Sequence, residues 1–273
     1  VPVRFYDFDE YNSVISPDIY EFHLSYSDMD IDINKFFKTE FDSEFVVHAP
    51  ELFEGSHLMD LTSLNKDHLE KSIRETQRVI DLTRSLNKYF PKTKKPLIVA
   101  NVGGWSMDKV IDEDEKEELY NNFANSLKRL DLTDVEIIPQ TMAPFPWHFG
   151  GQRFQNIFVQ AEEIEFWCKK LNLRVCFDIS HSFLTCNNFN ADFYDFAKKI
   201  APLTAHLHIG DAVGVNGEGM QIEDGEVNFH DLNRILKEGC PKASFIPEIW
   251  QGHKDRGAGF WVALDKLQNS YNF

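Results

Sequence analysis

The sequence predicts an α/β fold of the closed (β/α)8 type, in which eight parallel strands alternate with helices. Eight short apolar or β-branched runs recur at fairly even intervals, and amphipathic helical stretches lie between most of them. The chain has 273 residues, close to the roughly 250 residues that are usual for such a barrel. We therefore expect one eight-stranded parallel TIM-barrel domain that covers residues 1–273.

The predicted strands are nearly continuous apolar runs, as is typical of parallel strands that are buried on both faces. They cover residues 3–6, 20–26, 44–50, 96–102, 135–141, 173–180, 205–210 and 244–250. Helices are predicted at about 9–16, 65–89, 113–130, 157–171, 190–201, 230–238 and 258–269, several opening on a capping Asn or Asp. A doubly wound open sheet is the alternative, but no GxGxxG turn follows the first strand.

Composition indicates a folded, soluble protein that binds neither nucleic acid nor membranes. The 28 Lys and Arg residues face 44 Asp and Glu residues, and the resulting net charge of −16 repels phosphate backbones. Every apolar run ends well short of the ~18 residues that a membrane span needs. Because the four cysteines form no CxxC pair, we expect reduced thiols and a cytoplasmic protein. The chain opens on Val without a signal peptide, and we expect that it was excised from a longer polypeptide.

Polar side chains stand near the carboxyl ends of most predicted strands, where a barrel of this kind carries its reacting groups. They are Glu21, His23, His48, Asn101, Gln140, Asp178, His181, His206, His208, Asp211 and Glu248. A lone His or Asn at such a place is more often a hydrogen-bonded structural residue than a ligand. Asp178, His181, His208 and Glu248 are the exception, because several strands each end in a polar group that is costly to bury unless it is paired or bound to a metal. We therefore predict a divalent-cation site there.

The loop at residues 142–156, MAPFPWHFGGQRFQN, is the most distinctive stretch of the chain. We expect it to place Trp147, His148 and Arg153 over the barrel mouth, where aromatic faces and one cation suit a polyol or a carboxylated sugar. Arg153 is the candidate for contact with an anionic group. The alternative is a loop that packs only for stability.

The segments VVHAPE, FDISHS, HLHIGDA and IPEIW resemble the xylose isomerase-like TIM-barrel superfamily. It contains sugar isomerases and epimerases together with the AP endonuclease family 2 enzymes. In the epimerase-type members four side chains hold one divalent cation, here Mn²⁺, Zn²⁺ or Mg²⁺, and the matching residues are Gln140, Asp178, His208 and Glu248. The endonuclease branch is disfavoured, because Asn101 stands where its zinc cluster requires a His.

The resemblance also implies roles for residues around the metal. Glu248 and His181 would be catalytic, the first as base and the second in orienting hydroxyl groups. The substrate-binding residues that we expect are His48, Asn101, Trp147, His148, Arg153 and Asp211.

One position departs from the superfamily pattern, since Gln140 stands where a Glu is expected. An amide oxygen can ligate a metal but cannot take or give a proton. Three alternatives stay open. Another acid such as Glu21, Asp211 or Glu218 supplies the second proton site, the reaction needs only one base, or the site binds a sugar without converting it.

The sequence thus predicts a divalent-metal-dependent isomerase or epimerase that acts on a sugar or amino sugar. The alternative is a non-catalytic sugar-binding or scaffold domain of a multidomain synthase. The opening segments FDEYN and YEFHLSYSDMD loosely resemble the barrel-like extension of some N-acetylneuraminate (sialic acid) synthase-type proteins. That resemblance implies a role in sialic or nonulosonic acid biosynthesis and a covalently linked synthase domain as partner.

Overall fold

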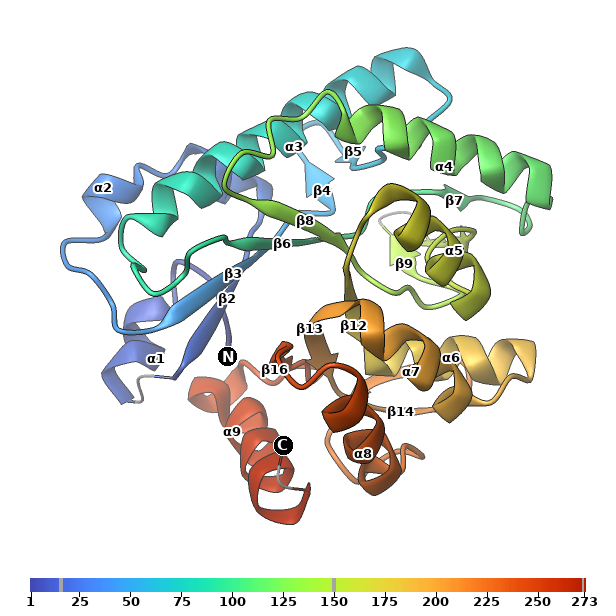
Figure 1. The fold of residues 1–273 in the computed structure, drawn as a ribbon. Coiled ribbons are helices and arrows are strands. Elements are labelled where there is room, and N and C mark those ends of the chain that lie inside the picture. Colours follow the sequence, from blue (N-terminus) through green and yellow to red (C-terminus); the bar gives the residue numbers. More distant parts are fainter. Residues whose placement is uncertain (15–16, 149–150, 272) are drawn as a thin grey trace. The chain divides into compact units, whose positions relative to one another are not determined.

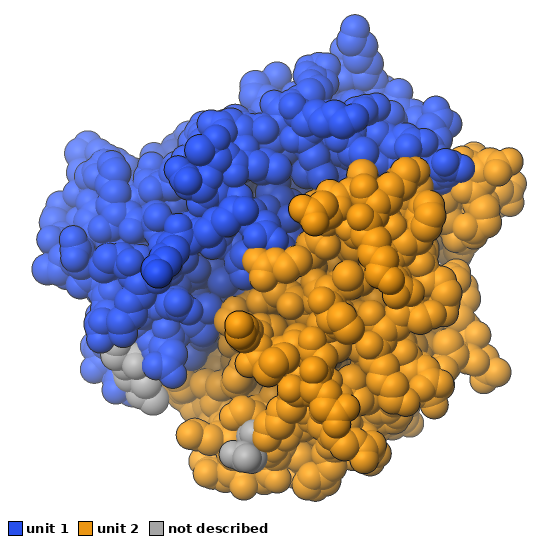
Figure 2. Space-filling view, in the orientation of Figure 1, with its two compact units in different colours: residues 1–104, 117–139 blue, residues 105–116, 140–273 orange. Residues whose placement is uncertain are grey.

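The structure is a computed structural model that describes residues 1–14, 17–148, 151–271 and 273. Its contacts divide the chain into two compact units (Figure 2). The first unit comprises Val1–Gly104 and Glu117–Pro139, and the second comprises Trp105–Lys116 and Gln140–Phe273.

The first unit is built on a parallel sheet of five strands (Figure 1). In sheet order these are β1 (Pro2–Val3), β2 (Ile19–His23), β3 (Glu44–His48), β6 (Leu97–Ala100) and β8 (Glu136–Pro139). The register places His23 opposite His48 at the carboxyl ends of β2 and β3. Central residues such as Phe22, Val47 and Ile98 are completely buried, as expected for strands that are covered on both faces.

Helices and a small hairpin complete the first unit. They are α1 (Phe8–Val14), the 3-10 helix η1 (Tyr26–Asp30), α2 (Ile33–Phe36), α3 (Lys66–Asn87), the hairpin of β4 (Leu52–Phe53) with β5 (His57–Leu58), and α4 (Glu113–Leu127), which belongs to this unit from Glu117 onward. The long helix α3 begins after Asn65, whose side chain accepts a hydrogen bond from the His68 amide. Phenyl rings fill the core beside β2, where Phe8 lies 5.5 Å from Phe22 and 6.3 Å from Phe90 between ring centroids.

The second unit contains a parallel sheet of three strands, in the order β12 (Val175–Asp178), β13 (Thr204–Ile209) and β16 (Ser244–Pro247). Every residue of the central strand β13 is buried. The register places Asp178 beside His208 at the carboxyl ends of β12 and β13. Gln140 directly follows β8 in the chain and forms a parallel bridge with Cys176 of β12.

The helices of the second unit are α5 (Ala161–Leu171), α6 (Ile179–Phe189), α7 (Phe193–Ile200), the 3-10 helix η2 (Ala201–Leu203), α8 (Phe229–Gly239) and α9 (Lys254–Tyr271). Three small antiparallel pairs join β7 (Trp105–Ser106) to β11 (Phe154–Gln155), β9 (Trp147–His148) to β10 (Gly151–Gln152), and β14 (Asp211–Val213) to β15 (Gly217–Met220). Helix α7 packs against α5, α6 and α8 (Figure 1).

The eight predicted strands and the predicted helices are all present, although most strands are shorter than expected. The main difference is α6, which was not predicted. The apolar run 173–180 includes the end of β12 and the start of α6, because Asp178 ends the strand and caps the helix. Among the described residues, no helix is both long enough and apolar enough to cross a membrane.

Candidate metal and sugar site

The turn from β12 into α6 positions the first group of the site. Asp178 caps α6 through its Oδ1 atom, which accepts the His181 amide at 2.9 Å. The Asp178 amide donates to Thr141 Oγ1 at 2.9 Å, and that hydroxyl lies 2.9 Å from Ser182 Oγ. These bonds fix the Asp178 backbone and leave Oδ2 directed at the neighbouring strands.

Oδ2 of Asp178 belongs to a cluster of groups that could ligate a metal. His208 on β13 is completely buried, and its Nδ1 atom lies 2.6 Å from Glu248 Oε2 and 3.8 Å from Asp178 Oδ2. Glu248 follows β16, and its amide donates to the Ile209 carbonyl at 2.9 Å. One ligand atom of each of Asp178, His208 and Glu248 lies within 4.8 Å of the other two.

Gln140 completes the cluster and is itself buried. Its Nε2 atom donates to Asp178 Oδ2 at 2.8 Å and lies 3.2 Å from His208 Nδ1. Because the amide is planar, a half-turn about its last bond would put Oε1 where Nε2 lies, and an oxygen there can ligate a cation.

The donor set fits a divalent cation. Two carboxylates, one imidazole and one amide converge from four segments of the second unit, and the Asp178 side chain is only 2% exposed. Negative charge held this far from water is costly unless positive charge compensates it. Oxygen ligands with one imidazole suit Mn²⁺, Mg²⁺ or Zn²⁺.

His181 stands at the edge of the cluster on the first turn of α6. Its Nδ1 atom lies 3.1 Å from the Thr141 carbonyl oxygen and 3.3 Å from Asp178 Oδ2, and its Nε2 atom lies 3.6 Å from Glu218 Oε2 on β15. Burial by itself would lower the pKa of His181. The negative charges of Asp178, Glu218 and Glu248 outweigh that effect, so the pKa is raised.

Two predicted substrate contacts, His48 and Asn101, belong to the first unit. His48 Nδ1 lies 3.0 Å from the Ala49 carbonyl oxygen, and its ring stacks on that of His23 with centroids 4.9 Å apart. The Asn101 side chain donates to Glu51 Oε1 at 3.3 Å and accepts the Gly103 amide at 3.2 Å. Their role as substrate contacts stays a prediction.

The distinctive loop forms a hairpin that is closed by two backbone hydrogen bonds, from the Arg153 amide to the Pro146 carbonyl and from the Gln155 amide to the Pro144 carbonyl, both at 3.0 Å. Trp147 and His148 form the backbone of β9, but their side chains lie outside the described part of the chain. The Arg153 guanidinium lies over the indole of Trp105, with Cζ 5.7 Å from the ring centroid. This contact ties the hairpin to β7.

Asp211 has a structural environment rather than the open one that a substrate contact needs. It is completely buried, and its carboxylate accepts backbone amides of Ala212 and Val227 at Oδ1 and of Glu223 and Gly225 at Oδ2, at 2.8 to 3.0 Å. A Cβ atom on Gly225 would lie 2.4 Å from Oδ1, so only glycine permits this close approach. These bonds hold the segment after β15 against β14.

Sequence reasoning missed Thr141, which orients both Asp178 and His181. Its place beside Gln140 at a strand end is a signal that could have found it. The contact between Glu218 and His181 has no such signal, because it depends on how the β14–β15 hairpin folds back on α6.

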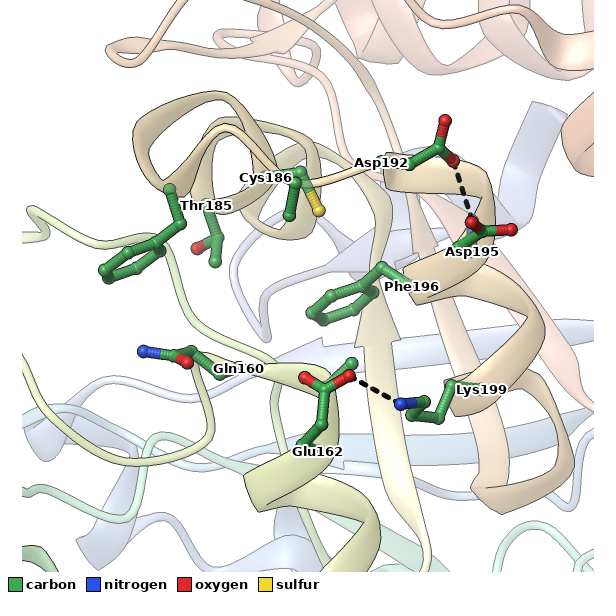
Figure 3. A pocket seen from close by; sticks show the side chains of 11 residues that line it. Gln160, Glu162, Thr185, Cys186, Asp192, Asp195, Phe196 and Lys199 are labelled. Carbon is green, nitrogen blue, oxygen red and sulfur yellow. Dashed lines mark hydrogen bonds and ion pairs between the residues drawn. The ribbon is translucent and has the colours of Figure 1, made fainter. Parts of the chain in front are cut away.

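A separate cavity of about 220 Å³ lies between α5, α6 and α7 (Figure 3). None of the predicted site residues lines it. Two of its charged side chains form an ion pair, in which Lys199 Nζ lies 2.5 Å from Glu162 Oε1. A third, Asp192, caps α7 by accepting the Asp195 amide. We assign no function to this cavity.

Comparison with known proteins identifies the family. The model of the xylose isomerase-like TIM barrel family matches residues 11–267. Among curated proteins, no sequence matches the chain.

Solved structures show the same fold. A D-tagatose 3-epimerase-like protein is 17% identical, with 98% of this chain and 96% of that one covered and a TM-score of 0.66. D-psicose 3-epimerase from Clostridium cellulolyticum, solved with D-tagatose, is 16% identical over 99% of this chain and 98% of that one, with a TM-score of 0.67. D-allulose 3-epimerase from Methylomonas sp., solved with D-allulose, is 11% identical over 96% of this chain and 89% of that one, with a TM-score of 0.65.

At these identities the likeness concerns the fold, and it confirms the predicted eight-stranded barrel. The family model covers nearly the whole chain. The protein therefore belongs to the xylose isomerase-like TIM barrel family.

Proposed function

We propose that the protein is a divalent-metal-dependent sugar isomerase or epimerase. The observation that carries this proposal is the convergence of Asp178, His208 and Glu248, whose ligand atoms lie within 4.8 Å of one another, together with the Gln140 amide. Similar structures that are sugar 3-epimerases by name support the same class of reaction.

A divalent cation at this cluster would polarise the carbonyl and the neighbouring hydroxyl of a sugar. Glu248 would then take the proton from the carbon next to the carbonyl. Its side chain is 36% exposed whereas His208 is not exposed at all, so Glu248 can both touch the cluster and reach a substrate. His181, at 20% exposed, would bind a substrate hydroxyl.

The amide at position 140 bears on the type of reaction. Epimerisation with two bases needs a proton-transfer group on each face of the sugar carbon, and Gln140 cannot be one of them. Within the cluster of Gln140, Asp178, His208 and Glu248, the buried Asp178 is held by its cap and by Gln140, which leaves Glu248 as the base. This arrangement favours an aldose–ketose conversion, in which one base moves the proton between adjacent carbons.

The substrate that we propose is a sugar or an amino sugar. A role in sialic or nonulosonic acid biosynthesis, a linked synthase domain, a single barrel domain and a cytoplasmic location rest on the sequence predictions alone. His48, Asn101, Trp147, His148 and Arg153 stay in the proposed substrate set, whereas the contacts of Asp211 support a structural role.

The second candidate function is a sugar-binding or scaffold domain without catalysis. One observation favours it, because Gln140 Nε2 donates directly to Asp178. A hydrogen bond from the amide partly compensates the carboxylate charge, which is the task that a cation would otherwise perform.

Elemental analysis of the purified protein tests the proposal. We expect near-stoichiometric Mn, Zn or Mg in the wild type, and we expect this metal to be lost in His208→Ala. His206→Ala is the control and should keep the metal, because His206 lies on the same strand but its Nδ1 atom lies 2.7 Å from Ser244 Oγ. Thermal unfolding of both variants shows whether they are folded. A folded wild type that stays metal-free with added Mn²⁺, Zn²⁺ or Mg²⁺ would refute the metalloenzyme and leave the binding domain.

A further inference from the structure

A cavity of about 290 Å³ lies in the first unit, and none of the predicted site residues lines it. Its walls come from the 3-10 helix η1, from β4 with the residue that follows it, and from α3 (Figure 1). The lining includes Tyr26, Asp30, Phe53, Glu54, Glu75 and Arg78. This volume is close to the lower end of the roughly 300 to 1,000 Å³ of small-molecule sites, so the cavity has room for one small ligand.

An arginine bridges two carboxylates on one wall of the cavity. Arg78 donates from one terminal nitrogen to Glu75 Oε2 and from the other to Asp30 Oδ1, both at 2.7 Å. Glu75 lies three residues earlier on α3, so the two side chains leave the same face of the helix. Such charge-assisted bonds fix the plane of the guanidinium. Two of its five N–H groups make these bonds, and the others can donate to a ligand.

Two aromatic rings add apolar surface to the lining. Phe53 is 2% exposed, whereas Tyr26 is 50% exposed. A tyrosine ring that is open to solvent can pack against the C–H groups of a sugar while its hydroxyl stays in water. A pyranose with equatorial hydroxyls, such as β-D-glucopyranose, carries C–H groups on both ring faces and hydroxyls around its edge. Aromatic surface and polar groups in one cavity suit a ligand of that shape.

The charge of the lining limits the ligand further. The carboxylates of Asp30, Glu54 and Glu75 outnumber the guanidinium of Arg78, so they repel sugar phosphates and uronic acids. A metal cation is not favoured, because Arg78 already compensates two of the carboxylates. Neutral hydroxyls can accept from the guanidinium and donate to the carboxylates. We propose that this cavity binds a neutral pyranose sugar, as a carbohydrate site that goes beyond the proposed function and does not depend on it.

Local contacts hold the walls of the cavity together. The amide and the Oγ atom of Ser25 both donate to Asp28 Oδ2 at 2.7 Å, which caps η1. Strand β4 pairs with β5, and Lys71 Nζ on α3 donates to the Glu54 carbonyl at 2.8 Å. The bridge made by Arg78 joins η1 to α3. A sugar that enters this cavity therefore needs to order little of the chain, which favours binding.

Titration with methyl β-D-glucopyranoside tests the proposal, because a methyl glycoside has no free carbonyl and cannot be converted at the metal cluster. Two-dimensional ¹H–¹⁵N NMR of the whole protein follows the backbone amides of residues 26–30 and 53–54. We expect these amides to shift with a Kd in the millimolar range, as is typical of a ligand of about a dozen atoms. Methyl β-D-glucuronide, which carries a carboxylate, should bind at least about tenfold more weakly.

Variants of the lining show whether the sugar binds in this cavity. Tyr26→Leu removes the aromatic ring and Arg78→Gln removes the guanidinium, and each should raise the Kd by about tenfold. The controls carry the same replacements outside the cavity. They are Tyr6→Leu, at a ring that is 77% exposed, and Arg84→Gln on α3, whose guanidinium also pairs with two carboxylates. Both controls should keep the Kd of the wild type, and thermal unfolding shows which variants are folded.

The absence of shifts at residues 26–30 and 53–54 would overturn the proposal, as would shifts confined to the segments around the metal cluster. A folded Tyr26→Leu variant with the Kd of the wild type would also overturn it. This variant removes no charge, so it decides the question even if Arg78→Gln does not fold. Equal binding of the glucuronide would overturn the assignment to a neutral sugar. None of these outcomes depends on turnover, so they stay distinct from a failure of the proposed isomerase.

Discussion

Replacing Gln140 by Glu probes the centre of the cluster, because it restores the carboxylate that the superfamily pattern carries there. The change exchanges the N–H···O bond between Gln140 Nε2 and Asp178 Oδ2, at 2.8 Å, for a contact between two carboxylates. Two unit charges at that distance repel by about 6 kcal/mol at an effective dielectric constant of about 20.

Protonation limits the cost of this repulsion. A carboxyl group with an ordinary pKa of about 4.3 can be held protonated at pH 7 for about 4 kcal/mol, which is less than the repulsion, so the pair would share a proton. The folded-state pKa is then raised above the unfolded value, and stability is lost as the pH rises above about 4. Without metal, Gln140→Glu should therefore be about 4 kcal/mol less stable than the wild type at pH 7 and about 1 kcal/mol less stable at pH 5.

Thermal unfolding in EDTA at both pH values measures the effect, and a loss of about 4 kcal/mol corresponds to roughly 10 °C in Tm. Added Mn²⁺ or Zn²⁺ should raise the Tm of Gln140→Glu more than that of the wild type, because the extra carboxylate is also a ligand. Gln140→Met is the control, since it removes the hydrogen bonds without adding charge, and its cost should change less between pH 5 and pH 7 than that of Gln140→Glu. A Gln140→Glu variant whose stability relative to the wild type is the same at pH 5 and pH 7 would refute the contact with Asp178.

Three further predictions concern separate parts of the molecule. Glu248→Gln should keep its metal, since an amide oxygen can ligate, but should lose deuterium exchange into D-tagatose by at least about a hundredfold; undiminished exchange would exclude Glu248 as the base. The two carboxylate oxygens of Asp211 accept four backbone amides, and Asp211→Asn puts an NH2 donor in place of one of these oxygens. The free energy of unfolding, measured in urea, should therefore fall by roughly 2 to 4 kcal/mol, whereas Asp224→Asn at an exposed position should change it little. Burial, assisted by the charge of His68, lowers the pKa of His57 from 6.5 to about 4, so the unfolded chain binds a proton that the native state does not. Stability should fall by about 3 kcal/mol between pH 6.5 and pH 4, and His57→Gln should remove that part of the pH dependence; an unchanged pH profile in this variant would contradict the assignment.

The order of strands and helices was predictable because it depends on local patterns. The run 96–102 is mostly apolar and does not alternate with polar residues, which is typical of a strand that is covered on both faces. Helix α6 escaped prediction because Asp178 serves two elements at once, as the last residue of β12 and as the cap of α6. Because no loop residue separates the strand from the helix, the hydrophobic pattern of the sequence does not mark the boundary between them.

The sequence by itself determined the barrel class and the residue types at the strand ends, because hydrophobic period and chain order suffice for both. That Asp178, His208 and Glu248 gather within 4.8 Å followed from parallel strands that share one edge, so this part of the site was also foreseeable. Only the tertiary structure decided the directions of the side chains. The Asp211 carboxylate points toward the backbone and accepts hydrogen bonds from four amides. The Glu218 carboxylate lies close to the His181 ring. Both outcomes depend on the path of the β14–β15 hairpin and its following segment, which hydrogen bonds between residues distant in the sequence determine and no local pattern encodes.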